Sequence, residues 1–205
     1  MTEQLISFMM ASVLLTISPG PDIIYVLSQS LVGGYKRGVV IAMGLVSGII
    51  VHTSLVAFGV SLIIKNSPSL FWAIKIAGAL YLLYLAFKVY RSPKQTFTKS
   101  KAKKAQVSFI SDYKTGFIMN ILNPKVTIFF LAFFPGFLWN REEDLMFQFY
   151  TLGGLFMLQA FLIFCLVAIL SGQLSKFLFS SSSSHSFLKW FQILTFIGIA
   201  ILILL

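Results

Sequence analysis

Six long apolar stretches alternate with shorter polar segments along the chain. Each is close to the roughly 20 residues that an α-helix needs to cross the ~30 Å hydrocarbon core of a bilayer. Backbone polar groups must be paired inside a bilayer, and the short alternating segments of membrane β-barrels are absent from the pattern. The pattern therefore predicts an all-α integral membrane protein with six transmembrane helices, at residues 5–32, 38–64, 70–90, 115–139, 146–171 and 187–205.

The composition supports this class. Of 205 residues, 58% are hydrophobic and 11% are charged, which is too apolar for a soluble domain of this length. The formal net charge of +10 could suggest a nucleic-acid partner. However, most basic residues lie between or beside the apolar stretches, where lysine and arginine determine topology. We therefore expect a lipid bilayer and no nucleic acid as partner.

The charges of the connections predict an orientation. Lysine and arginine are concentrated in the first, third and fifth connections, so the positive-inside rule places these in the cytoplasm. Both termini are then expected outside. Glu3 stands where a signal peptide would carry basic residues, and no small-x-small cleavage site follows, so we interpret the first stretch as a retained span. The serine run 180–184 is expected to be a flexible loop.

The first apolar stretch is interrupted near its middle. Each proline removes an amide donor and clashes with the preceding turn, and glycine adds backbone freedom. A carboxylate follows directly, inside a segment that crosses the bilayer. The sequence predicts a broken first helix at Ser18-Pro19-Gly20-Pro21-Asp22.

A basic linker at residues 91–112 divides the chain into two sets of three spans, residues 1–90 and 113–205. Because three is odd, the second set enters the membrane with the opposite orientation, as in transporters built from inverted repeats. The fourth stretch has its own break, Asn123-Pro124-Lys125, at nearly the same depth as the first. We therefore expect two inverted three-helix repeats with proline-broken helices 1 and 4.

Paired breaks at corresponding positions of two repeats indicate a substrate site near the midplane. A broken helix exposes amides whose positive end favours anions. A charge at this depth costs several kcal/mol unless it is paired or hydrated. The predicted substrate- and proton-binding residues are those of the two breaks: Ser18, Pro19, Gly20, Pro21, Asp22, Asn123, Pro124 and Lys125.

Two further residues belong to the predicted site. His52 lies near the middle of the second stretch, where its imidazole either relays protons or is hydrogen-bonded to a neighbouring span. Asn120 precedes the second break by one turn and either caps carbonyl groups or lines the site. Tyr81, Tyr84 and Gln159 are weaker cavity candidates.

The chain also resembles the LysE/RhtB amino-acid exporters over nearly its full length. The resemblance is carried by SPGPD at 18–22, GIIVH at 48–52, KIAGALYLLYLAFK at 75–88, and GFIMNILNPK at 116–125 followed by FFLAFFPGF. Ala86 and Gly136 depart from the glycine and glutamine common in the family, which bears on substrate identity. The resemblance implies export of amino acids across the bacterial inner membrane, driven by the proton-motive force.

An amino acid presents an ammonium and a carboxylate group. We expect Asp22 to bind the ammonium and Lys125, aided by helix amides, to bind the carboxylate. In the empty carrier the two side chains either pair with each other or Asp22 binds a proton. No second acidic residue lies deep in a span, which favours neutral amino acids. Gly44 and Gly48 permit close helix packing, and glycine faces of this kind would allow a homodimer without requiring one.

Other function classes fit the sequence less well. An intramembrane metalloprotease requires a His-Glu-x-x-His motif, and the two histidines, His52 and His185, do not form one. No P-loop is present, and clusters of metal ligands are missing from the spans. We expect no enzyme activity, no cofactor and no resident metal. An exporter of another small solute or of a metal cation is the alternative.

Overall fold

The computed structural model describes residues 2–60, 63, 67–92, 108–140, 144–180 and 182–204. Across these ranges the regular structure is entirely helical, which confirms the all-α class. The helices are α1 (Thr2–Ile17), α2 (Pro21–Gly33), α3 (Tyr35–Leu55), π-helical η1 (Val56–Val60), α5 (Pro68–Arg91), α6 (Phe109–Ile121), α7 (Pro124–Ile128), π-helical η2 (Phe129–Phe133), 3₁₀-helical η3 (Phe134–Phe137), α8 (Leu145–Ile169), α9 (Ser171–Ser180) and α10 (Ser182–Leu204).

Four of the described helices are long and apolar enough to cross a membrane: Tyr35–Val60, Pro68–Arg91, Leu145–Ile169 and Ser186–Leu204. Two more candidates are bent pairs. α1 and α2 meet at 55°, and α6 meets the segment Pro124–Phe137 at 47°. Both predicted helix breaks are therefore confirmed. The protein is a multi-pass membrane protein, with six crossings if each bent pair counts as one.

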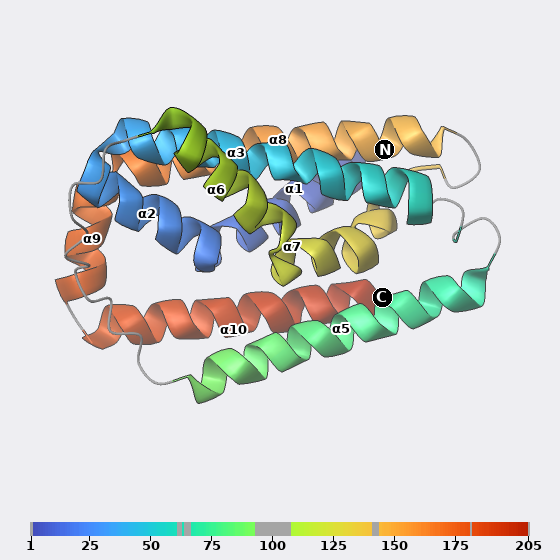
Figure 1. The fold of residues 1–205 in the computed structure, drawn as a ribbon. Helices are drawn as coiled ribbons and strands as arrows, with labels where there is room; N and C mark the ends of the chain where they lie inside the picture. Colours follow the sequence, from blue (N-terminus) through green and yellow to red (C-terminus); the bar gives the residue numbers. More distant parts are fainter. Residues whose placement is uncertain are drawn as a thin grey trace.

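The helices form a bundle in which the two broken pairs lie in the middle (Figure 1). α3 packs along α6 and α8 on one side, and α5 packs along α10 on the other. α1 contacts α8, while η2 contacts α5, so the elements beside the breaks are covered from both sides. This arrangement removes the unpaired backbone groups of the breaks from lipid, which irregular backbone inside a bilayer requires.

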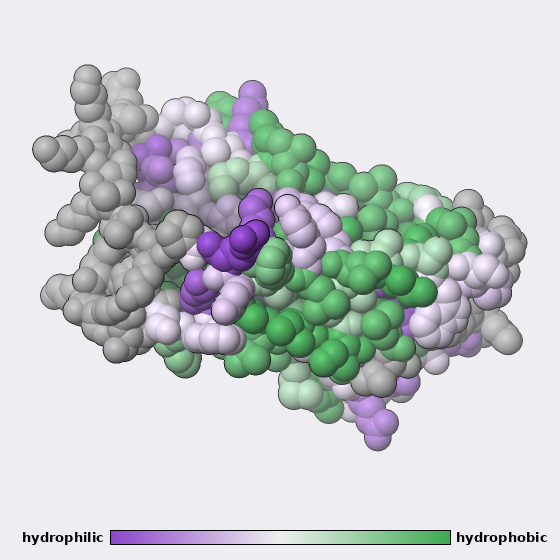
Figure 2. Space-filling model, turned by 90° about the horizontal axis from the view of Figure 1, so that it is seen from below, coloured by the Kyte–Doolittle hydropathy of each residue, from purple (hydrophilic) through white to green (hydrophobic). Residues whose placement is uncertain are grey.

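α5 and α10 present an apolar outer face. Figure 2 shows this face as a hydrophobic band with hydrophilic residues toward its ends. Large apolar side chains are exposed along both helices, as expected for a surface that contacts lipid tails. They include Ile76, Leu80, Leu83, Phe87, Leu194, Ile201 and Leu202.

α3 and α6 approach each other so closely that their backbones touch. A Cβ atom on Gly44 would collide with the carbonyl oxygen of Tyr113, and one on Gly116 would collide with the carbonyl oxygen of Ile41. A Cβ on Gly48 would lie 2.7 Å from Oδ1 of Asn120. The glycine pair predicted to permit close packing does so, and it holds the second break against α3.

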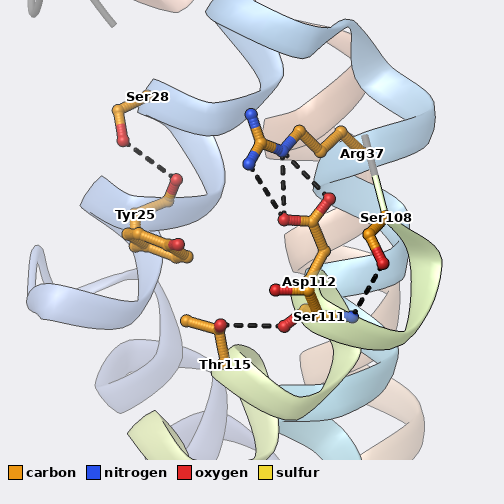
Figure 3. A network of polar contacts seen from close by, with 7 residues as sticks. All are labelled: Tyr25, Ser28, Arg37, Ser108, Ser111, Asp112 and Thr115. Carbon is orange, nitrogen blue, oxygen red and sulfur yellow. Dashed lines mark hydrogen bonds and ion pairs between the residues drawn. The ribbon is translucent and has the colours of Figure 1, made fainter. Parts of the chain in front are cut away.

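A buried ion pair joins α3 and α6 near their first turns (Figure 3). The Arg37 guanidinium donates from Nε to both carboxylate oxygens of Asp112, at 3.1 and 3.0 Å, and from Nη2 to Oδ1 at 3.0 Å. The side chains are only 12% and 6% exposed. Two-pronged guanidinium–carboxylate geometry of this kind is strong and directional.

Asp112→Ala should lower the stability of the protein by about 2 kcal/mol, because it leaves the Arg37 guanidinium buried without its partner. The measurement is thermal unfolding of the detergent-purified protein. The charge-swapped double variant Arg37→Asp with Asp112→Arg should recover at least half of the loss. Equal stability of Asp112→Ala and the natural protein would contradict this role.

Two connections differ from the sequence expectation. α6 begins at Phe109, inside the segment predicted as linker, because Ser108 caps the helix by accepting a hydrogen bond from the Ser111 amide at 3.4 Å. The described residues of the serine run are helical, since α9 ends at Ser180 and α10 begins at Ser182. Serine is favoured at helix N-termini, such as the start of α10. Most of the predicted basic linker, residues 93–107, lies outside the described residues.

Candidate substrate site

The first break opens the C-terminal end of α1. α1 ends at Ile17, and Gly20 caps α2 in an extended conformation with φ −133° and ψ −179°. In a continuous helix the amide of residue 19 would bond to the carbonyl of Leu15, but Pro19 has no amide. The last carbonyl groups of α1 therefore need donors from elsewhere in the molecule.

Lys125, from the other half of the chain, supplies these donors. Its Nζ donates to the carbonyl oxygens of Leu15 at 2.6 Å and Ser18 at 2.9 Å, and the residue is only 8% exposed. The side chain passes Gly20, where a Cβ atom would lie 3.5 Å from Nζ. A cation at the negative end of the α1 dipole is favourable.

The second break also frees a carbonyl group that finds other partners. Pro124 has no amide for the Asn120 carbonyl, which instead accepts from the Asn123 amide at 3.0 Å and lies 3.1 Å from His52 Nε2. Asn123 caps α7, because its Oδ1 accepts from the Lys125 amide at 3.0 Å. Of the two interpretations of His52, the hydrogen bond to a neighbouring span is the one observed.

Asp22 lies in the first turn of α2 and faces the second break. Its Oδ2 accepts from Nδ2 of Asn123 at 2.6 Å. Its Oδ1 is buried and has no hydrogen-bond partner among the described residues. Among the described residues, Asp22 and Lys125 form no direct ion pair with each other. Each break is thus held by a side chain from the other half, Lys125 on the first and Asp22 on the second.

A cavity of about 20 Å³ lies between the breaks, enough for roughly one water molecule. Its lining includes five of the ten predicted site residues: Ser18, Gly20, Asp22, Asn120 and Lys125. Of the other five, Asn123 and His52 contact these residues as described above. The three remaining predicted residues, Pro19, Pro21 and Pro124, shape the breaks without lining the cavity.

The rest of the lining was not predicted. Phe156, Ala160 and Phe164 follow one another at four-residue intervals, so they form one face of α8. The wall is completed by the hydroxyl-bearing Thr16 and by four apolar residues: Leu15, Ile23, Ile49 and Val126. These positions carry no sequence signal, because α8 is apolar on all sides and periodicity cannot indicate which face meets the cavity.

Of the three weaker cavity candidates, one lies beside the first break and two lie away from the cavity. Gln159 lies beside the first break, where its Nε2 donates to Oγ1 of Thr16 at 3.0 Å and its Oε1 has no partner among the described residues. Tyr84 is 55% exposed on α5, and its ring centroid lies 5.9 Å from that of Tyr81. Neither tyrosine lines the cavity.

Within the described ranges, no group of three or more His, Cys, Asp or Glu residues is arranged to hold a metal ion.

The model of the LysE type translocator family matches residues 13–205, which include both breaks and every residue of the cavity lining. The chain belongs to this family. The resemblance drawn from the sequence motifs is therefore confirmed. Members of a translocator family move solutes across membranes. In this LysE family member, the cavity between the breaks brings together buried charge and hydrogen-bonding groups that have no partner among the described residues.

Curated relatives include proteins named leucine efflux protein from Salmonella choleraesuis, Salmonella paratyphi A and Salmonella typhimurium. Each is 31% identical to this chain over 132 residues, which is 64% of the chain and 62% of the relative. The matched segment thus spans less than two thirds of these relatives. No solved structure matches this LysE family member significantly.

Proposed function

We propose that this protein is a secondary exporter of neutral amino acids in the bacterial inner membrane, and that it exchanges substrate for protons at the cavity between the two breaks. One observation carries the proposal: the cavity is lined by a carboxylate, Asp22, with one oxygen free of partners among the described residues. A buried, unsatisfied carboxylate inside a membrane is expensive, and it is retained where it binds something.

The cavity has two chemically different sides. The breaks contribute hydroxyl, amide, carboxylate and ammonium groups, whereas α8 contributes only apolar side chains. This division matches an amino acid whose polar head faces the breaks and whose apolar side chain faces α8. Membership in the LysE type translocator family supports transport, and the leucine efflux proteins among the relatives support an apolar, neutral substrate.

Contacts between the halves support an inverted repeat of six spans. His52, in the second candidate span, bonds to the break of the fourth. Gln159, in the fifth, bonds to Thr16 beside the break of the first. The two residues hold corresponding places in the two halves, and each contacts a residue beside the break of the other half, as expected when residues 1–90 and 113–205 have opposite orientation. With six spans, both termini lie on the same side of the membrane, which the positive-inside rule makes the outside.

Proton coupling follows from competition for one carboxylate. In the proposed cycle, Asp22 binds the ammonium group of the substrate on the cytoplasmic side and a proton on the outside. Because the two cations exclude each other from the carboxylate, each turnover exports one amino acid and returns a proton.

Export can be tested in an amino-acid-sensitive bacterial strain that expresses the protein and is fed dipeptides. Intracellular hydrolysis raises the free amino acids, and those that leave the cells are measured by mass spectrometry. Apolar neutral amino acids should accumulate outside more rapidly than in cells that carry an empty vector. Identical external profiles in the two strains would reject the proposal.

Ala160→Phe should restrict export to small substrates. Ala160 is 1% exposed and is the only small residue that α8 contributes to the cavity wall within the described chain, so a phenyl ring there would occupy the space proposed for the substrate side chain. Leucine export should fall at least roughly tenfold, which corresponds to about 1.4 kcal/mol, and alanine export should fall less. Leu158→Phe, on the exposed face of α8, is the control. Equal loss for both substrates would contradict this role.

A further inference from the structure

The end of α1 presents more oxygen atoms than it has donors. Two carbonyl oxygens, from Leu15 and Ser18, accept hydrogen bonds from Lys125. Two more oxygen atoms beside the same cavity, Ser18 Oγ and Asp22 Oδ1, are buried without any partner among the described residues. Ser18 is fully buried and Asp22 is 8% exposed. We call Leu15, Ser18 and Asp22 the ammonium cage.

The chemistry of the ammonium cage matches one class of ligand. All four oxygen atoms are able to accept hydrogen bonds, one belongs to a carboxylate, and two lie at the negative end of a helix dipole. A primary ammonium group is compact, carries one positive charge and donates three hydrogen bonds. The Lys125 ammonium already donates to two of these oxygen atoms, the carbonyls of Leu15 and Ser18.

We propose that the ammonium cage is a binding site for primary ammonium groups, and that Lys125 occupies it as an internal ligand while the protein is empty. The proposal deepens the proposed function and rests on it, because the substrate's α-ammonium then replaces Lys125. This replacement releases Lys125 toward the substrate carboxylate, the group it was expected to bind.

Charge balance explains the need for an internal ligand. Asp22 and Lys125 line the same small cavity but form no direct ion pair among the described residues. Opposite charges in so small a cavity attract each other. If Lys125 left an empty site, a carboxylate would remain uncompensated inside the membrane, at a cost of several kcal/mol. Lys125 therefore keeps the empty site neutral, and only a second cation can take its place.

The size of the cavity agrees with this exchange. About 20 Å³ accommodates one water molecule and no amino acid. The Lys125 side chain runs past Gly20, with Cδ 3.8 Å from the position of a Cβ atom there. Withdrawal of this side chain would enlarge the cavity on the side where the substrate's ammonium must bind.

The test uses Lys125→Ala, which empties the cage while leaving its oxygen atoms in place. Thermal unfolding of the full-length purified variant is measured in detergent with methylammonium chloride or tetramethylammonium chloride. The second salt has the same charge but no N–H donors. The melting temperature of Lys125→Ala should rise by roughly 2–4 °C once methylammonium exceeds its dissociation constant about fivefold, and should not rise with tetramethylammonium.

Matched variants make the result specific. The natural protein, whose cage is filled, and Lys114→Ala, which removes an exposed lysine of α6, should show no methylammonium shift. Adding Asp22→Asn to Lys125→Ala should abolish the shift. The proposal is overturned if Lys125→Ala shows no shift, or if either salt shifts all variants equally.

If Lys125→Ala does not fold, its yield is measured after expression with each salt. Recovery of folded protein with methylammonium alone supports the proposal, and equal yields overturn it. Methylammonium binding by a protein that exports no amino acid in the dipeptide assay would reject the exporter and retain the cage. Amino-acid export without methylammonium binding would reject the cage and retain the exporter.

Discussion

Asp22→Asn is expected to abolish amino-acid export. The substitution keeps the size of the side chain and an oxygen that can accept the 2.6 Å hydrogen bond from Asn123, so the two breaks remain joined. It removes the negative charge that the proposed mechanism uses for both the substrate ammonium and the proton. A buried pair between a carboxylate and an ammonium is worth about 3 kcal/mol or more, so the export rate should fall roughly 100-fold or more.

The measurement is the initial rate of amino-acid release from dipeptide-fed cells, with the amount of membrane-inserted protein determined by immunoblot. Asp144→Asn is the matched control, because Asp144 is exposed at the start of α8 and its side chain does not cap the helix. It should export normally. Export by Asp22→Asn at the natural rate, with equal insertion, would exclude Asp22 as the coupling carboxylate.

Gly116→Ala is expected to cause a large loss of stability through a single added methyl group. A Cβ atom at this position would collide with the Ile41 carbonyl oxygen and lie 3.0 Å from the Leu45 amide nitrogen. Both neighbours are backbone atoms of α3, which cannot rotate away as a side chain can. Separating the two helices should cost about 3 kcal/mol and lower the melting temperature by roughly 6–12 °C.

Gly154→Ala is the control for helix propensity. Gly154 lies on α8 with open space around its Cα, so alanine meets no neighbouring atom there. Alanine stabilises a helix by about 0.5–1 kcal/mol relative to glycine, and the control should therefore unfold at the same or a higher temperature. A similar melting temperature for both variants would show that α3 and α6 are not held by backbone contact.

Much of the fold is readable from local chemistry. Length and apolar composition predict helices that cross a membrane, because a bilayer leaves few alternatives for the backbone. The breaks at Pro19 and Pro124 are equally local, since proline lacks an amide wherever the chain goes. The apolar pattern predicts the start of α6 too late, because it does not register a capping residue such as Ser108. The prediction of a loop at the serine run is also wrong for Ser180 and Ser182, which lie in helices.

At the breaks, too, some features are local and others depend on how the chain packs. Local sequence predicts both breaks and the charged residue beside each of them, Asp22 and Lys125. Tertiary packing sets the partners of the groups at the breaks: Lys125 donates to a carbonyl of α1, His52 lies beside the Asn120 carbonyl, and Asp22 accepts a hydrogen bond from the Asn123 side chain. It also decided that the apolar wall comes from one face of α8. Such partners are far apart in the chain, and their choice depends on how the two halves pack, which no local pattern records.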